Sequence, residues 1–144
     1  MHKFEVVTGY TDIILPKRGT AGSAGYDFHM PEDLTLMPGE EYKVETGVKC
    51  QIEDGWFLAI FPRSSLGFKY KMRLANTVGI IDSDYYNNES NEGHIMIKIC
   101  NEGSNMIKLN KGDAFAQGIF IHYGVTADDD VKEKRTGGIG STGR

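Results

Sequence analysis

Two aspartates two residues apart, Asp82 and Asp84, follow an apolar stretch and precede Tyr85. One carboxylate could polarise a water molecule while the other holds the loop through hydrogen bonds. On a strand the two side chains would face the same way, whereas in a turn they would diverge. These residues alone also permit an ordinary loop in which aspartates cap backbone N–H groups.

A second polar group, Arg63, Ser64 and Ser65, follows an apolar run that ends at Pro62. A guanidinium, two hydroxyls and free N–H groups at the start of a helix would suit the oxygens of a phosphate. A serine N-cap is an equally open interpretation. Gln117 follows a turn and could contact an amide or a phosphate, or face solvent, so it indicates little alone.

The C-terminal residues 135–144 are rich in glycine, and their spacing fits the dinucleotide fingerprint G-x-G-x-x-G. That motif and the P-loop both need a strand before the glycines and a helix after them, so neither is expected here. Backbone N–H groups that no side chain crowds can still close around an anion, with donors added by Ser141, Thr142 and Arg144. Taken alone, the segment is also compatible with a flexible terminus.

The loop of residues 20–28 consists mostly of small residues and contains Asp27. It permits a tight connection in which Asp27 accepts hydrogen bonds from backbone donors. The four histidines show no spacing typical of a metal site, and they support no Ser-His-Asp arrangement.

The chain has 144 residues, enough for one domain with its own core, and a formal net charge of −4. That charge argues against the broad basic surface of a nucleic-acid-binding protein but permits a local site for a nucleotide. Cys50 and Cys100 are too few for a disulfide framework, which favours a reducing, cytoplasmic setting. We expect neither a signal peptide nor a membrane span, because no apolar run approaches roughly 18 residues.

Strands must position these candidate residues, since apolar and polar residues alternate through much of the chain. We expect strands over residues 42–52, 56–61, 95–100, 105–109 and 115–123, with hairpin turns at residues 54–55 and 110–113. The run 56–61 is apolar throughout, as in a strand buried on both faces, and a short helical turn is expected within residues 64–72. Many short strands separated by turn residues predict an all-β sandwich, barrel or jelly roll.

Five segments, in this order, resemble the five motifs of the homotrimeric dUTPase family: Ala24-Gly25-Tyr26-Asp27-Phe28, Pro62-Arg63-Ser64-Ser65, and residues 79–85, 112–117 and 135–143. Any one motif is weakly specific. Five in order over 144 residues are strongly specific, and they outweigh the structural interpretations of the first three segments.

The resemblance implies an all-β, jelly-roll-like β-barrel of the trimeric dUTPase type over residues 1–125. Residues 126–144 would form a C-terminal arm and a flexible, glycine-rich lid. The family assembles as a homotrimer whose three active sites are shared between subunits. Its activity is the Mg²⁺-dependent hydrolysis of dUTP to dUMP and pyrophosphate, with no nucleic-acid or membrane partner expected.

The resemblance also implies roles for individual residues at the nucleoside. Asp82 would hold and activate the water that attacks the α-phosphorus. Tyr85 would stack under the deoxyribose and leave no room for a 2′-hydroxyl. Asn76, with the backbone of Gly79, Ile80 and Ile81, would contact the edge of uracil, and Met96 would flank the nucleoside.

Further residues would contact the phosphates and the metal. Arg63, Ser64, Ser65 and Gln117 would bind phosphates, while Asp27 would lie near Mg²⁺, in its outer sphere at most. The tail would close over the nucleotide, and the substrate-binding residues expected in it are Arg135, Gly138, Ile139, Gly140, Ser141 and Thr142.

Three features depart from the family pattern. Ala114 stands where the family usually has an arginine, and Ile139 stands where a phenylalanine usually stacks on uracil. The tail is one residue short after Arg135, so Lys134 or Arg135 would contact the terminal phosphate. Residues 86–92 form a longer link than usual, for which a neutral surface insertion is favoured over a partner-binding loop.

Two other functions remain open on the same fold. A relative that deaminates dCTP would need a glutamate beside the base, and no such motif is found. A nucleotide-binding regulatory protein without turnover is the other alternative, which Ala114 and the longer loop permit.

Overall fold

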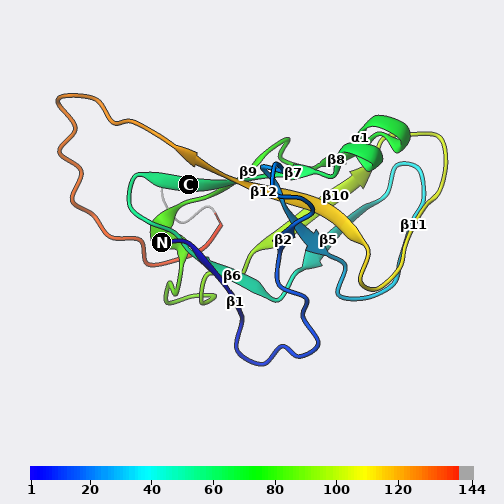
Figure 1. Cartoon of the computed structure of the whole chain (residues 1–144), viewed down its shortest axis with the longest axis horizontal. Coiled ribbons are helices and arrows are strands. Elements are labelled where there is room, and N and C mark those ends of the chain that lie inside the picture. Colours follow the sequence, from blue (N-terminus) through cyan, green and yellow to red (C-terminus); the bar gives the residue numbers. More distant parts are fainter. Residues whose placement is uncertain (140–144) are drawn as a thin grey trace.

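The computed structural model describes residues 1–139; Gly140, Ser141 and Thr142, which the sequence places in the lid, lie outside the described residues. Strands dominate the chain, as predicted (Figure 1). They are β1 Lys3–Val6, β2 Lys17–Arg18, β3 Tyr26–His29, β4 Leu34–Leu36, β5 Glu41–Glu45, β6 Val48–Gln51, β7 Trp56–Pro62, β8 Met72–Leu74, β9 Gly79–Ile81, β10 Met96–Asn101, β11 Ile107–Leu109 and β12 Ala114–His122. The helix α1 spans Ser64–Tyr70, and the 3-10 turn η1 spans Ser83–Tyr85.

The described strands form antiparallel sheets that share one core. The largest sheet has the order β2-β3-β12-β7-β9, a second has the order β5-β10-β8, and the pairs β1-β6 and β4-β11 complete the set. Alternate residues of facing strands enter a single buried cluster, for example Phe28 and Leu58 from the large sheet and Ile97 and Ile99 from the second. The predicted alternation of residues 95–100 is therefore confirmed.

Two predictions about strand pairing are wrong, although the turns themselves are present. Residues 54–55 and 110–113 do turn, with Trp56 N donating to Glu53 O and Asp113 N to Asn110 O. However, β6 pairs with β1 while β7 pairs with β12 and β9, and β11 pairs with β4 rather than with β12. A turn signal fixes a change of direction but does not fix the partner of each strand.

The predicted strand over residues 42–52 is divided into β5 and β6. Gly47 lies between them with φ 74°, a left-handed conformation that favours glycine. A Cβ at this position would lie 2.7 Å from Ile13 Cδ1 and 2.9 Å from Tyr10 Cδ2. The break lets β5 pair with β10 while β6 pairs with β1, so the chain passes from one sheet to another.

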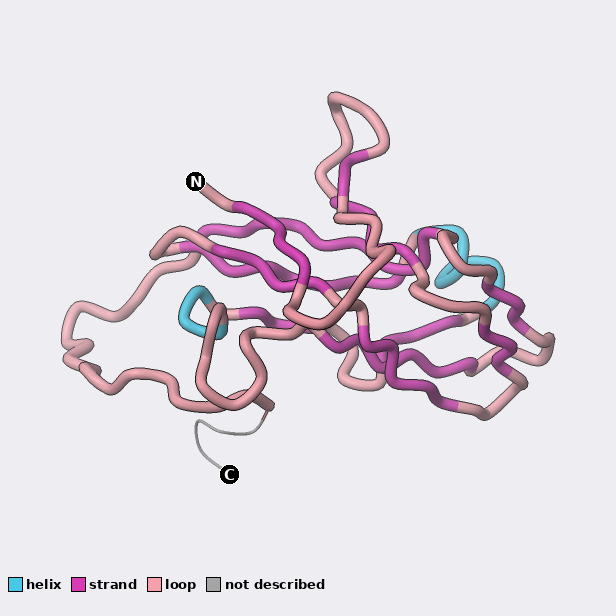
Figure 2. The backbone as a smooth tube through the Cα atoms, turned by 90° about the horizontal axis from the view of Figure 1, so that it is seen from below, coloured by secondary structure: helices cyan, strands magenta, loops and turns pink. Residues whose placement is uncertain are grey.

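The two short helical elements lie at opposite ends of the molecule. α1 lies at one end and η1 at the other, as both Figure 1 and Figure 2 show. After β12, residues 123–139 form neither helix nor strand, and they curve back toward η1. The end of the described chain therefore lies beside η1 and not beside α1.

Candidate active site

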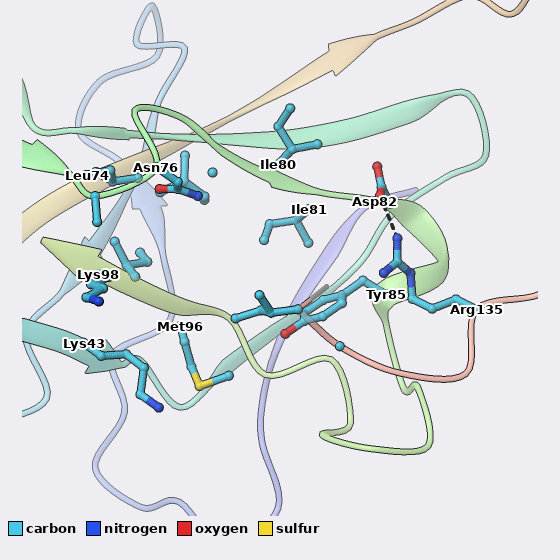
Figure 3. A pocket seen from close by; sticks show the side chains of 16 residues that line it. Lys43, Leu74, Asn76, Ile80, Ile81, Asp82, Tyr85, Met96, Lys98 and Arg135 are labelled. Carbon is cyan, nitrogen blue, oxygen red and sulfur yellow. Dashed lines mark hydrogen bonds and ion pairs between the residues drawn. The ribbon is translucent and has the colours of Figure 1, made fainter. Parts of the chain in front are cut away.

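A cavity of about 520 Å³ opens where the large sheet and the second sheet meet, between β9 and β10 (Figure 3). The cavity is lined by apolar side chains from both sheets, together with several polar side chains. The residues that the sequence assigned to the nucleoside line this cavity, together with part of the tail. They are Asn76, Gly79, Ile80, Ile81, Asp82, Tyr85 and Met96, and from the tail Arg135, Gly138 and Ile139.

The segment between β8 and β9 shapes this cavity. β8 pairs with β10 and β9 pairs with β7, so residues 75–78 cross from one sheet to the other. Thr77 has φ 72° in this crossing, and Val78 N donates to Asn76 O at 2.8 Å. Gly79 packs so closely on β7 that a Cβ would lie 3.0 Å from Ile60 Cβ. The N–H groups of Ala75, Thr77 and Val78 are used within the protein, but Asn76 is exposed, and β9 is the last strand of the large sheet, so one edge of its backbone has no strand partner in that sheet.

The two aspartates converge on one arginine. Arg135 Nη2 donates to Asp82 Oδ2 at 2.7 Å, and Arg135 Nε donates to Asp84 Oδ1 at 2.8 Å. Asp82 directly precedes η1 and Asp84 lies within it, so a turn, and not a strand, brings the carboxylates together. The carboxylate side chains are 52% and 55% exposed, whereas the Arg135 side chain is 11% exposed.

Tyr85 is held rigidly at the cavity wall. Its hydroxyl donates to His94 O at 2.6 Å and accepts from Asn91 Nδ2 at 2.8 Å. Burial raises the pKa of the Tyr85 phenol, and the Asn91 hydrogen bond and the charge of Arg135 oppose that rise. The Arg135 guanidinium lies 5.8 Å from the centre of the Tyr85 ring. The ring is therefore neutral near pH 7 and fixed in orientation.

Two lysines that were not predicted as site residues also line the cavity. Lys43 on β5 and Lys98 on β10 are register partners, and both alternate with core residues. The alternation of the strands predicts that both lysines face solvent, and both are exposed. The same face of these strands also forms a wall of the cavity. Met96 lies two residues before Lys98 and therefore on the same face of the strand. This spacing is the signal that could have identified the two lysines as site residues.

The other sequence-predicted residues form a second cluster away from the cavity. Arg63, Ser64 and Ser65 are exposed at the start of α1, and Arg63 precedes the first helical residue. Gln117 Nε2 donates to Pro62 O at 3.2 Å, and Asp27 is the register partner of Gln117. Gly25 also belongs here, because an added Cβ would overlap Gln117 Oε1. Arg63, Ser64 and Ser65 lie at the start of α1, whereas Asp82 and Tyr85 lie at η1, and these two elements are at opposite ends of the molecule (Figures 1 and 2).

The departures from the family pattern have visible structural settings. Ala114 begins β12, and the register of β12 against β3 shifts between Ala114 and Ala116. Ile139 lines the cavity and is 81% exposed. Residues 86–93 form an ordered loop with an internal hydrogen-bond network beside Tyr85.

Within residues 1–139, no group of three or more His, Cys, Asp or Glu side chains is placed to hold a metal ion. A divalent ion bound mainly by substrate phosphates and water needs no such group, and the Asp27 carboxylate beside Gln117 fits an outer-sphere contact. Across the same residues, no helix is long and apolar enough to span a membrane.

Residues 11–143 match the sequence model of the family described as dUTPase. The chain belongs to the dUTPase family. A deoxyuridine 5′-triphosphate nucleotidohydrolase of Lactococcus lactis is 43% identical, over 97% of this chain and 96% of that protein. One of Paraburkholderia xenovorans is 38% identical, over 90% of this chain and 89% of the relative.

Solved structures of dUTPases share the fold. The crystal structure of a dUTPase from Streptococcus mutans superimposes with a TM-score of 0.77 and 42% identity, covering 85% of this chain and 97% of that one. A dUTPase mutant from phage phi11 of S. aureus, described with a structural Mg(II) ion, has a TM-score of 0.74 at 20% identity, which supports the fold alone.

Proposed function

We propose that the chain hydrolyses dUTP to dUMP and pyrophosphate. The observation that carries this proposal is the cavity, where an aspartate at the rim, a fixed tyrosine and the edge strand β9 meet. Family membership and relatives named as dUTP nucleotidohydrolases support it. The finer features proposed with it are a jelly-roll-like barrel over residues 1–125, an arm and lid over residues 126–144, and a cytoplasmic location.

Asp82 acts as the group that orients the attacking water. Its carboxylate is half exposed at the cavity rim, so a water molecule can approach it. As the water oxygen bonds to the α-phosphorus, Asp82 accepts its proton, and the bond to the oxygen bridging the α- and β-phosphorus breaks. Pyrophosphate leaves with that oxygen, and dUMP remains.

The cavity walls select the nucleoside. The Asn76 amide and the backbone of Gly79, Ile80 and Ile81 pair with the uracil edge, and cytosine would leave buried groups unpaired. The Tyr85 ring lies under the deoxyribose, where it leaves no space for a 2′-hydroxyl, and Met96 flanks the nucleoside. Lys43 and Lys98 add positive charge to this wall.

The phosphates are bound by the second cluster of another subunit. Arg63, Ser64, Ser65 and Gln117 offer donors, but α1, which begins at Ser64, lies at the opposite end of the chain from η1. A homotrimer with shared active sites would bring the two halves together. The tail then closes over the nucleotide, with Gly138, Ile139, Gly140, Ser141 and Thr142 as its contacts and Arg135 on a phosphate.

Mg²⁺ would be held by the phosphates and water, with Asp27 in its outer sphere. When bound, it offsets negative charge on the pyrophosphate leaving group. The residues Arg63 and Arg135 add fixed positive charge near the same oxygens.

Pyrophosphate release from dUTP in the presence of Mg²⁺ tests the proposed reaction. The variant Asp82→Asn keeps the side-chain shape, and its turnover should fall by about 10²- to 10⁴-fold while the thermal melt is retained. Ammonia release from dCTP would instead identify a deaminase. Tight dUTP binding without turnover would identify a regulatory protein, and either result would refute the proposal.

Mixed assembly tests the shared site. Asp82→Asn and Arg63→Ala trimers should each be nearly inactive, because each homotrimer lacks one half of every site. Unfolding and refolding them together should restore activity, since some sites then combine Asp82 of one subunit with Arg63 of another. No recovery in refolded mixtures of confirmed composition would show that each site lies within one chain.

A further inference from the structure

The loop of residues 86–93, which follows Tyr85, is built around one buried amide. Asn88 is 7% exposed, and its Oδ1 accepts from Ser90 N at 3.0 Å, Ser90 Oγ at 3.0 Å and Asn91 N at 3.2 Å. Its Nδ2 donates to Tyr85 O and to Asn91 Oδ1, both at 2.7 Å. Because every polar atom of this amide is used, the loop is a folded element and not a slack insertion.

The outer side of this loop is fixed to the β1-β6 pair and its neighbours. Glu92 accepts from Thr8 N at 2.8 Å and from Thr8 Oγ1 at 2.6 Å. Lys49 Nζ donates to Asn87 Oδ1 at 2.7 Å. At Gly93, where φ is 86°, a Cβ would lie 2.8 Å from Tyr85 O. The loop is therefore held from outside and pressed against the backbone that carries Tyr85.

Asn91 is the member of this loop that binds the Tyr85 hydroxyl at the cavity wall. Its Oδ1 accepts from Asn88 Nδ2 at 2.7 Å and from Gly93 N at 3.1 Å, while its Nδ2 donates to the Tyr85 hydroxyl at 2.8 Å. Since that hydroxyl donates to His94 O, the only hydrogen-bond role left to it is that of acceptor. An amide supplies both functions in a fixed orientation, which an alanine or an aspartate could not.

The same amide also contacts the C-terminal arm. A Cβ added at Gly138 would lie 2.8 Å from Asn91 Nδ2, 3.4 Å from Asn91 Cγ and 3.6 Å from Ser90 Oγ. The backbone of the arm thus lies directly on the loop, close to Tyr85. The absence of a side chain at Gly138 permits this approach, and any larger residue would push the arm away.

We infer that Asn91 is a positioning residue for the reaction, because it holds the Tyr85 phenol and supports the arm at Gly138 through one amide. The inference rests on the proposed function, in which the Tyr85 ring lies under the deoxyribose and the arm closes over the nucleotide. Asn91 does not line the cavity itself. It acts by fixing the ring that excludes the 2′-hydroxyl and by giving the closed arm a surface to lie on.

The variant Asn91→Asp isolates this role. The retained Oδ1 can still accept from Asn88 and Gly93, but the donor to the phenol is replaced by an acceptor. Its kcat/KM for dUTP should fall by about three- to tenfold, the range for one lost hydrogen bond, and its preference for dUTP over UTP should fall as well. The matched control Thr8→Val removes an outer contact of the loop and should leave both quantities unchanged.

Two further variants keep the test decisive if Asn91→Asp folds poorly. Tyr85→Phe removes the hydrogen bond from Asn91 together with the one that the phenol donates to His94 O, and it should also reduce the dUTP preference. Because the phenol is then absent, adding Asn91→Asp to it should change that preference little. Gly138→Ala should raise KM for dUTP more than it lowers kcat, because it displaces the arm from Asn91.

Unchanged preference in both Asn91→Asp and Tyr85→Phe would overturn the inference while leaving dUTP hydrolysis intact. Additive effects of those two substitutions would overturn it as well, since the two groups would then act separately. Failure of the unmodified protein to release pyrophosphate from dUTP would be a distinct result, which refutes the proposed function and this inference together.

Discussion

Replacing Gly79 by alanine should disturb the floor of the cavity and the stability of the fold at once. Gly79 is the register partner of Ile60 in the β7-β9 pair, and an added Cβ would lie 3.0 Å from Ile60 Cβ and 3.3 Å from Ile60 Cγ1. Ile60 is 1% exposed and its Cβ is fixed to the backbone, so it cannot swing away. We expect β9 to be displaced from β7 by a few tenths of an ångström.

The stability cost follows from two opposing contributions. Overpacking of this kind costs about 1–3 kcal/mol, and the lower chain entropy of alanine in the unfolded state returns about 0.4–1 kcal/mol. The midpoints of the two ranges give a net loss of about 1.3 kcal/mol, which corresponds to a fall of roughly 3–5 °C in Tm for a domain of this size. The kcat/KM for dUTP should fall more steeply, by at least about tenfold, because small misplacements of a binding wall are costly in rate.

Thermal denaturation and steady-state pyrophosphate release measure these two effects. Gly22→Ala is the matched control, since nothing lies within 4 Å of a Cβ there and the same backbone-entropy change applies. Its Tm should be unchanged or slightly raised, with wild-type kinetics. If Gly79→Ala behaved like Gly22→Ala, the close packing of β9 on β7 would not govern the cavity, and the argument would be wrong.

Three further outcomes are expected. Burial lowers the pKa of His94, whose Nε2 accepts from Gly47 N at 2.9 Å, so the folded state favours the neutral imidazole. The stability that depends on neutral His94 is complete above about pH 6.5 and is lost as the pH falls through the folded pKa. Urea denaturation at pH 7.5 and 5.5 should show a larger loss for the wild type than for His94→Gln; equal losses would contradict this. Gly25→Ala should move the Gln117 side chain and raise KM for dUTP without lowering Tm by more than a few degrees, and an unchanged KM would remove Gln117 from the site. Arg135→Lys keeps the charge but not the planar fork that reaches both aspartates, so kcat/KM should fall by about tenfold, whereas wild-type kinetics would show that charge alone suffices.

Strand content and the short helix were predictable because their signals are local. Alternation over residues 95–100 and the apolar run at residues 56–61 required only the period of a strand, and both correspond to β10 and β7. Pairing was not predictable, because the turn at residues 110–113 carries no information on whether β12 meets β11 or β3. Those choices depend on which side chains fill the common core, a property of the whole chain.

The sequence motifs identified the site residues but did not predict how these residues lie relative to one another in space. Asp82 and Asp84 are two residues apart, yet whether they converge depends on the η1 turn and on Arg135, some fifty residues further along the chain. Lys43 and Lys98 belong to no motif, and only the register of β5 against β10 brings them to the same wall. The contribution of residues 86–93 was also hidden, because a polar insertion in a sequence does not reveal an internally bonded loop.

Arg135 contacts Asp82 and Asp84 in this structure and is proposed to bind a phosphate, so it would have to exchange one set of contacts for the other. Solvent screens the two half-exposed carboxylates and weakens their attraction to the guanidinium, although the Arg135 side chain itself is only 11% exposed. A triphosphate carries more charge than either carboxylate and offers the bidentate geometry that arginine prefers. On substrate arrival the guanidinium would therefore move to the phosphates, and Asp82 would become free to hold the water.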